Sequence, residues 1–144
     1  MPSNKLIFPE PAIFKTSIKL GIHNINYGGH LGNEQVLSLM HEARMRWLVS
    51  LGYQSEIGLM NNIGIIITES LIQYKAEAFY GDELVISISL LDITNVGLQV
   101  YYRLDNITNG NVTAIGRTQI LFFDYALRKI ARMPGDFKIK LTNG

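Results

Sequence analysis

The sequence predicts an α+β domain in which an antiparallel sheet packs against one long helix. Apolar residues recur at helical spacing from residue 34 to residue 51, between Asn33 and Gly52. Residues 63–125 instead read as four strand segments, most of them alternating between apolar and polar side chains, with turn residues between them. Because strands joined by hairpins run antiparallel, these observations together predict one helix and one antiparallel sheet.

The long helix has clear start and stop signals. Asn33 is the expected N-cap, Glu34 complements the positive end of the helix dipole, and Gly52 is a natural C-terminal glycine. An apolar stripe runs along one face of this helix and consists of Val36, Met40, Ala43, Trp47 and Leu51. Leu37 and Leu48 lie beside the stripe, and Leu39, Met45 and Val49 lie on other sides. A helix with apolar residues around most of its circumference is expected to be enclosed by protein.

One strand is expected before the helix and four after it, at residues 13–22, 63–80, 83–94, 98–105 and 112–125. Turns are predicted at Gly81-Asp82 and at residues 95–97, and Asn109-Gly110 is a type I′ hairpin signal. The residues after 125 are less regular. Four consecutive hairpin strands leave sheet edges that tend to pair with a second copy, so we expect a homodimer or a dimer of dimers.

Length and composition limit the classes of protein. With 144 residues, the chain is expected to form a single domain, residues 1–144. It is 47% hydrophobic and 17% charged, with 13 basic and 12 acidic residues, so bulk charge favours neither nucleic acid nor an anionic membrane surface. It has no cysteine, which excludes disulfides and thiolate chemistry. The absence of a leader-like or membrane-spanning apolar stretch predicts a cytoplasmic protein.

Three motifs carry a family resemblance. Residues 24–33 read Asn-Ile-Asn-Tyr-Gly-Gly-His-Leu-Gly-Asn, the helix carries Glu-Ala-Arg at 42–44, and residues 80–84 read Tyr-Gly-Asp-Glu-Leu. They resemble the hotdog thioesterases of the 4-hydroxybenzoyl-CoA thioesterase-like group, whose pattern before the helix is Asp-x-Asp-x-x-Gly-His-x-Asn-Asn. The resemblance covers nearly the whole chain. It implies a hotdog fold, with the sheet curled round the helix, and an acyl-CoA thioesterase that uses no cofactor beyond the coenzyme A of its substrate.

The motif departs from the family at one decisive position. The second Asp of the pattern is the catalytic carboxylate of that group, and Asn26 stands there in this chain. A neutral amide has no usable proton affinity near neutral pH, so it is not a general base. Two interpretations stay open for Asn26: it positions water or the thioester carbonyl, or it is an Asx-turn residue.

The approach to the helix suggests further roles. Free N–H groups point outward at a helix N-terminus, and the resemblance implies that the backbone N–H of Asn33 polarises the thioester carbonyl; a plain N-cap is the simpler alternative. His30 is either a proton carrier or a residue that braces the turn through hydrogen bonds. The three histidines show no metal-ligand spacing, and no metal is expected.

Substrate binding is assigned to Tyr27 and Gly29 in the turn and to Lys75. The ammonium of Lys75 suits the phosphates of coenzyme A, as do the charges of Arg128, Lys129 and Arg132; the simpler alternative is that these charges at strand ends are only solvated. The acyl chain is expected in an apolar tunnel between protomers, against Met40 and Leu37. The resemblance leaves open whether the substrate is an acyl-CoA or an acyl-carrier thioester.

The helix also carries charges that need partners. Glu42 lies four residues before Arg46, which predicts an i,i+4 ion pair. Another branch of hotdog thioesterases carries its catalytic carboxylate on the central helix, so Glu42 is the first candidate base and Glu34 the second. Arg44 falls among apolar positions and is expected to pair with a buried carboxylate or to reach a dimer interface.

The first functional hypothesis is therefore a thioesterase that hydrolyses a fatty or aromatic acyl-CoA to the free acid and coenzyme A. The second is a catalytically impaired protein that binds acyl thioesters, and it is motivated by Asn26. A hotdog dehydratase or hydratase ranks last, because the histidine–carboxylate motif of those enzymes is not found.

Overall fold

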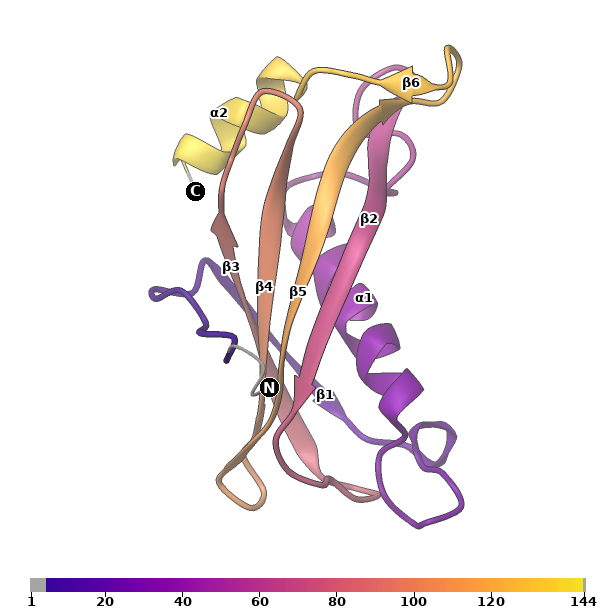
Figure 1. Ribbon diagram of the computed structural model, residues 1–144, viewed down its shortest axis with the longest axis vertical. Coiled ribbons are helices and arrows are strands. Elements are labelled where there is room, and N and C mark those ends of the chain that lie inside the picture. Colours follow the sequence, from indigo (N-terminus) through magenta and orange to yellow (C-terminus); the bar gives the residue numbers. More distant parts are fainter. Residues whose placement is uncertain (1–4, 144) are drawn as a thin grey trace.

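The computed structural model describes residues 5–143, so residues 1–4 and 144 of the expected domain lie outside the described range. One sheet lies along the long helix α1, and the C-terminal helix α2 packs at one end (Figure 1). The elements in chain order are β1 (Phe14–Lys19), the 3-10 helix η1 (Ile22–Asn24), α1 (Asn33–Ser50), β2 (Ile63–Tyr74), β3 (Glu83–Leu91), β4 (Gly97–Asn106), β5 (Asn111–Asp124), β6 (Lys129–Ile130) and α2 (Gly135–Asn143).

The sheet is antiparallel throughout its named pairs. Its strand order is β1-β3-β4-β5-β2, and the short β6 pairs with β5. The strands β3, β4 and β5 follow one another through hairpins, as their alternating pattern predicts. Residues of β3 and β4 that face the helix are fully buried: Leu84, Ile86, Ile88, Val100, Tyr102 and Leu104. The α+β class and the antiparallel sheet packed against a long helix are as expected.

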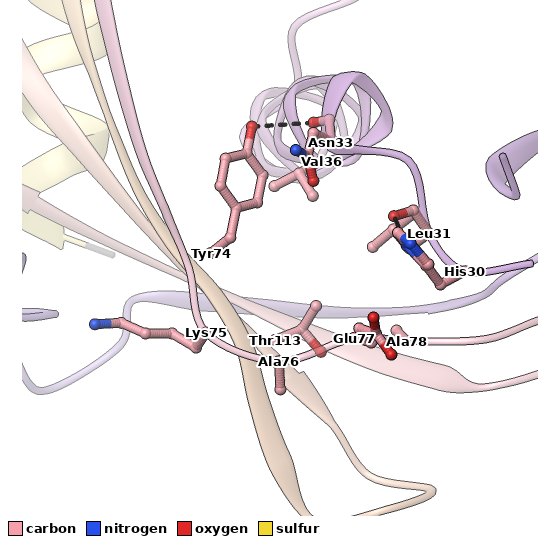
Figure 2. A pocket seen from close by; sticks show the side chains of 10 residues that line it. All are labelled: His30, Leu31, Asn33, Val36, Tyr74, Lys75, Ala76, Glu77, Ala78 and Thr113. Carbon is pink, nitrogen blue, oxygen red and sulfur yellow. Dashed lines mark hydrogen bonds between the residues drawn. The ribbon is translucent and has the colours of Figure 1, made fainter. Parts of the chain in front are cut away.

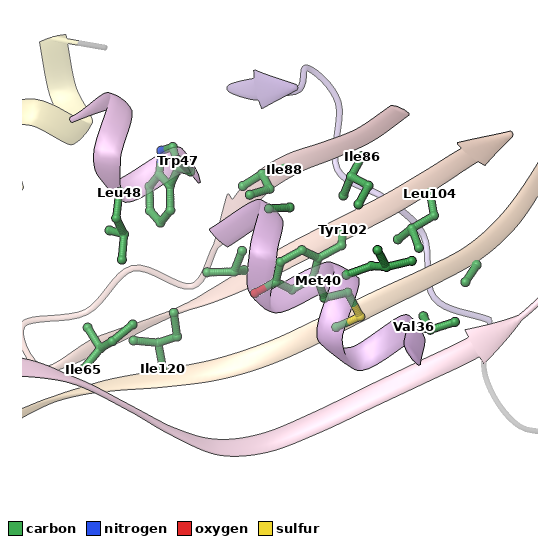
Figure 3. Packing of buried hydrophobic residues seen from close by; sticks show 14 of the residues in the cluster. Val36, Met40, Trp47, Leu48, Ile65, Ile86, Ile88, Tyr102, Leu104 and Ile120 are labelled. Carbon is green, nitrogen blue, oxygen red and sulfur yellow. The ribbon is translucent and has the colours of Figure 1, made fainter. Parts of the chain in front are cut away.

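Helix α1 contributes its apolar stripe to the core (Figure 3). Met40 is fully buried, and a Cβ built on Gly116 of β5 would lie 2.6 Å from its Sδ, so the glycine allows the helix to approach the sheet. The opposite face is open, with Leu37 45% and Val49 57% exposed. The expectation of a helix enclosed around most of its circumference is therefore wrong for the single chain, because the sheet covers one face only.

Two local predictions need correction. The N-cap is Gly32 and not Asn33, although the helix ends as expected, with Gly52 at φ +99°. The loop after β4 is longer than a type I′ turn, since Gly110 alone takes positive φ and its N–H donates to the carbonyl of Asn106 at 2.8 Å. The side chain of Asn106 widens this loop by accepting hydrogen bonds from the N–H groups of Thr108 and Asn109.

The strand predicted at residues 63–80 ends at Tyr74. Beyond it the chain turns away from β5 to run beside the helix entrance, where the N–H of Leu31 donates to the carbonyl of Ala78 at 2.7 Å. The tail, for which no regular element was predicted, forms β6 and α2. Phe137 of α2 is buried against three aromatic rings, those of Trp47, Tyr53 and Phe122. Neither helix within residues 5–143 has the length and apolarity to cross a membrane.

Candidate active site

The loop before α1 is held to the helix by a buried asparagine. The Oδ1 of Asn24 accepts the N–H of Gly21 at 2.9 Å, and its Nδ2 donates to Oε1 of Gln35 at 3.2 Å. The carbonyl of Asn24 also accepts the N–H of Gly32 at 3.0 Å. These bonds join both ends of the loop to the first turn of the helix, so the helix entrance has a defined shape.

Asn26 lies at the exposed side of this loop. Its Oδ1 accepts the N–H of Gly28 at 2.9 Å, which is an Asx turn, and its N–H donates to the carbonyl of His30 at 2.9 Å. Gly29, at φ +78°, completes the turn. Asn26 thus has the geometry of an Asx-turn residue, which is one of its two interpretations. It does not line the cavity described next.

A cavity of about 310 Å³ opens between the start of α1 and the segment that follows β2 (Figure 2). We call it the helix-mouth cavity. The hydroxyl of Tyr74 closes one wall by donating to the carbonyl of Asn33 at 3.2 Å. Its lining consists of His30, Leu31, Asn33, Val36, Tyr74, Lys75, Ala76, Glu77, Ala78 and Thr113.

His30 is half-buried at the edge of this cavity. Its Nδ1 lies 3.1 Å from the carbonyl oxygen of Leu31, and a carbonyl only accepts, so this nitrogen carries the proton. The Nε2 is then the acceptor of the neutral ring, and it faces Gly28, where a Cβ would approach within 3.0 Å. His30 therefore braces the turn, as one of its two interpretations predicts, and leaves one nitrogen for a proton.

The first turn of α1 borders the cavity at Asn33. Asn33 and Glu34 are the first two helical residues, and N–H groups at these positions have no intrahelical acceptor. The helix dipole adds positive potential at the same point. An oxygen that gains negative charge is stabilised by such donors, as in an oxyanion hole.

The structure brings together only some of the predicted site residues. Asn33, His30 and Lys75 line the helix-mouth cavity. Tyr27 is fully exposed at the tip of the loop, and it and Gly29 lie outside the cavity lining. These two assignments stay predictions.

Glu42 lies on a different side of α1. Its Oε2 accepts from Nε of Arg46 at 2.8 Å, which confirms the predicted i,i+4 ion pair. Arg46 also donates to Oγ1 of Thr16 at 2.8 Å, so the pair is tied to β1. The hollow that Glu42 lines shares no residue with the helix-mouth cavity.

Arg44 forms the buried pair that its position predicts. Its Nε donates to Oε2 of Glu56 at 2.5 Å, and a terminal nitrogen donates to the hydroxyl of Tyr102 at 2.9 Å. Burial alone lowers the pKa of Arg44, but its interactions with Tyr102 and Glu56 outweigh burial and raise it. Burial raises the pKa of Tyr102, although the nearby Arg44 charge opposes this shift. The network therefore holds one fixed positive charge against a neutral phenol.

A second hollow, which we call the α1–β2 groove, lies beside this network and measures about 270 Å³. It is lined by Leu37, Ser38, His41, Arg44, Ile67, Ser70 and Thr118. The groove and the helix-mouth cavity both lie between α1 and β2. The exposed side chain of Leu37 is available in the groove for contact with a ligand. Met40 is not available, because it is fully buried in the core.

Sequence reasoning missed Glu77, the one carboxylate that lines the helix-mouth cavity among residues 5–143. It was hidden inside the strand predicted at residues 63–80. Its place shortly before the Gly81-Asp82 turn, three residues ahead of the motif at residues 80–84, is the signal that could have pointed to the loop.

Comparison with known proteins identifies the class. Residues 20–141 match the thioesterase-like superfamily, so the chain belongs to that family. A 1,4-dihydroxy-2-naphthoyl-CoA thioesterase from Synechocystis has a similar structure, with 18% identity, a TM-score of 0.82 and coverage of 90% of this chain and 96% of that one. A hypothetical protein from Staphylococcus aureus solved in complex with CoA gives 14% identity, a TM-score of 0.81 and coverage of 98% and 87%.

A gentisyl-coenzyme A thioesterase is also similar in structure, with 17% identity, a TM-score of 0.77 and coverage of 88% of this chain and 98% of that chain. No curated protein matches the sequence. The similarities confirm the hotdog fold and the thioesterase-like family that the motifs predict.

Proposed function

We propose that this protein hydrolyses an acyl-CoA thioester to the free acid and coenzyme A. The observation that supports the proposal is the helix-mouth cavity, which is lined by Asn33, the first residue of an 18-residue helix, and by other polar residues, in a chain of the thioesterase-like superfamily. The similar proteins described as thioesterases act on coenzyme A thioesters of aromatic acids, which supports the same class of substrate.

In the proposed reaction, water attacks the carbonyl carbon of the thioester and the C–S bond breaks. The carbonyl oxygen gains negative charge in the transition state, and the N–H of Asn33 donates to it at the positive end of α1. Asn26 and His30, at the loop, remain candidates for orienting the water.

The substrate is proposed to run along α1. Lys75 stands at the cavity wall, where its ammonium meets a phosphate of coenzyme A. The acyl group lies in the α1–β2 groove against Leu37 and Ile67, and not against Met40. Serine and threonine hydroxyls in this groove suit an acyl group that carries polar substituents.

The first experiment measures free thiol release from a panel of acyl-CoA and acyl-carrier thioesters. The donor is tested with Asn33→Pro, which removes the N–H at the first helical position, where proline fits. Gly32 already has φ −69° and ψ 143°, which a residue before proline favours. Loss of one oxyanion donor predicts a fall of about 10²–10³-fold in kcat.

Asn33→Ala is the matched control, because it changes the same side chain and keeps the N–H. It should retain activity close to the native chain. Equal activity of the proline and alanine variants would remove the Asn33 amide from the mechanism, and release of no thiol from any substrate would reject the thioesterase proposal.

The second candidate function is an acyl-thioester-binding protein without catalysis, which the amide at Asn26 favours. The variant Asn26→Asp separates the two. If the native chain binds acyl-CoA but is inert, and Asn26→Asp hydrolyses it, the binding function is correct. If the native chain is already active, it is not.

We also propose that two copies assemble through β2. Among residues 5–143, β2 ends the strand order and pairs only with β5, so its outer edge is free. Ile67 and Leu71 are partly exposed along it. In sedimentation experiments, Leu71→Glu should shift the protein toward the monomer, whereas Leu91→Glu, at a similarly exposed position on β3, should not.

A further inference from the structure

A thioesterase in this chain needs a base, since the usual carboxylate position holds Asn26. We propose that the carboxylate of Glu77 is the general base that activates water in the helix-mouth cavity. This inference rests on the proposed thioesterase function and names one of its catalytic residues.

The other carboxylates with claims on the site are engaged or lie elsewhere. Glu42 is paired with Arg46 in a separate hollow, and Glu56 is held by both Arg44 and His41. Glu34 is the second residue of the helix, but its carboxylate lies over Gly32, where a Cβ would come within 2.6 Å of Oε1, and it does not line the cavity.

Glu77 differs from all three carboxylates in its position, and from Glu42 and Glu56 also in having no partner. It lines the helix-mouth cavity together with His30 and Asn33. Within residues 5–143 its carboxylate also forms no hydrogen bond or ion pair, so its oxygens are available to a water molecule. Figure 2 shows Glu77 on the side of the cavity where His30 and Leu31 lie, with Lys75 on the other side.

The backbone fixes where Glu77 stands. Ahead of it, the N–H groups of Lys75 and Ala76 both donate to the carbonyl of Thr113, at 2.8 and 3.2 Å. Behind it, the carbonyl of Ala78 accepts the N–H of Leu31 at 2.7 Å, and Phe79 forms an isolated β-bridge with His30. The residue is therefore anchored on both sides to the elements that form the cavity, while its exposed side chain is free to turn toward a substrate.

The proposed step begins with water. Glu77 takes a proton from water as the water oxygen bonds to the thioester carbonyl carbon, and the oxyanion rests on the helix N–H groups. When the tetrahedral intermediate collapses, the C–S bond breaks and the protonated Glu77 returns its proton to the leaving thiolate. The products are the acid and the coenzyme A thiol, and the carboxylate is restored.

The test compares Glu77→Gln with Glu42→Gln and Glu34→Gln, using whichever acyl-CoA the native chain hydrolyses best. Glutamine keeps the shape of the side chain and removes its basicity. We expect kcat of Glu77→Gln to fall about 10²–10⁴-fold with little change in KM, and both control variants to stay within about threefold of the native chain. The melting temperature of each variant reports on folding.

Two further readouts separate a base from a structural residue. The decline of kcat/KM on the acid side, which follows protonation of the base, should disappear in the residual activity of Glu77→Gln. Glu77→Ala should be partly restored by formate, which fits the space that the side chain leaves.

Three results would overturn the inference in an active protein: Glu77→Gln with near-native kcat, loss of activity in Glu42→Gln or Glu34→Gln instead, or a Glu77→Ala variant that formate does not restore. A native chain that hydrolyses no thioester rejects the proposed function itself, and this outcome is distinct because it precedes any comparison of variants.

Discussion

Arg44 of α1 donates a hydrogen bond of 2.9 Å from its guanidinium to the hydroxyl of Tyr102 on β4, inside the core. The same hydroxyl lies 2.8 Å from Oγ1 of Thr118 on β5. One phenol therefore connects the helix to two central strands. A buried charge is tolerated only when its donors are satisfied, so this contact determines how the middle of α1 sits on the sheet.

Replacing Tyr102 with Phe tests the network. Both Arg44 and Thr118 lose a buried partner, and we expect the free energy of unfolding to fall by about 1–3 kcal/mol. Urea denaturation measures the change. Tyr101→Phe is the control, because within residues 5–143 the hydroxyl of Tyr101 forms a hydrogen bond only with Gln99, at 3.4 Å. An equal loss in both variants would contradict a special role for Tyr102.

The raised tyrosine pKa values predict a loss of stability in alkali. Burial raises the pKa of Tyr102, and burial followed by the hydrogen bond to Asp136 raises the pKa of Tyr53. In the unfolded chain these phenols lose their protons near pH 10, at the ordinary tyrosine pKa of about 10. The folded state then holds more protons than the unfolded state, so the free energy of unfolding falls as pH rises above about 10.

Stability curves for urea unfolding between pH 8 and pH 11 measure this dependence. The decline should be shallower in Tyr102→Phe, which has one fewer raised phenol, and Arg44 should stay charged throughout because its pKa is also raised. Parallel curves for the native chain and the variant would contradict the assignment.

Lys75→Ala tests contact with coenzyme A. We expect KM for acyl-CoA to rise about tenfold, the equivalent of one charged hydrogen bond of about 1.5 kcal/mol. The KM for the matching acyl-pantetheine, which lacks the nucleotide phosphates, should not change. Lys129→Ala, on β6 at the far end of the sheet, is the control (Figure 1). A rise in KM for both substrates would place Lys75 near the acyl group instead.

Leu37→Ala tests the acyl site. The side chain lines the α1–β2 groove and is 45% exposed in the single chain, so its loss should cost little stability. It should lower kcat/KM for long or aromatic acyl-CoA about tenfold through lost apolar contact, and affect acetyl-CoA little. Val49→Ala removes a similarly exposed residue outside the groove and should leave all substrates unchanged.

Phe137→Ala tests whether α2 belongs to the core. This ring is 1% exposed and lies 5.3 Å from the ring of Phe122 and 6.0 Å from that of Trp47. We expect a loss of about 3–5 kcal/mol in the free energy of unfolding. Ile139→Ala, on the exposed face of the same helix, should change it by less than about 0.5 kcal/mol. A loss of less than about 0.5 kcal/mol in both variants would show that α2 is only loosely attached.

Local patterns in the sequence predict the elements of this fold because each depends on neighbouring residues. Helical spacing identified α1, and alternation identified β3, β4 and β5 nearly to their ends. The tail carried no periodicity because α2 is held by one aromatic anchor, Phe137, rather than by a long apolar stripe. Such an element is stabilised by tertiary contact, and a short helix has little stability of its own.

The candidate site was also predictable from the sequence only in part. The helix start, His30 and the absence of a carboxylate at residue 26 follow from the linear motif. The linear motif does not show which carboxylate reaches the cavity, because Glu42 is close to the motif in sequence but faces another side of the helix.

By itself, the sequence determined the class of the protein: a long helix entered through a glycine-rich loop, a hairpin sheet against it, and an amide at residue 26, where the pattern that the motif resembles has an acid. Only the tertiary structure decided that Glu77 stands at the helix mouth and that Glu56 receives Arg44. Periodicity and turn chemistry act over a few residues, whereas these placements depend on backbone hydrogen bonds and ion pairs between segments far apart in the chain.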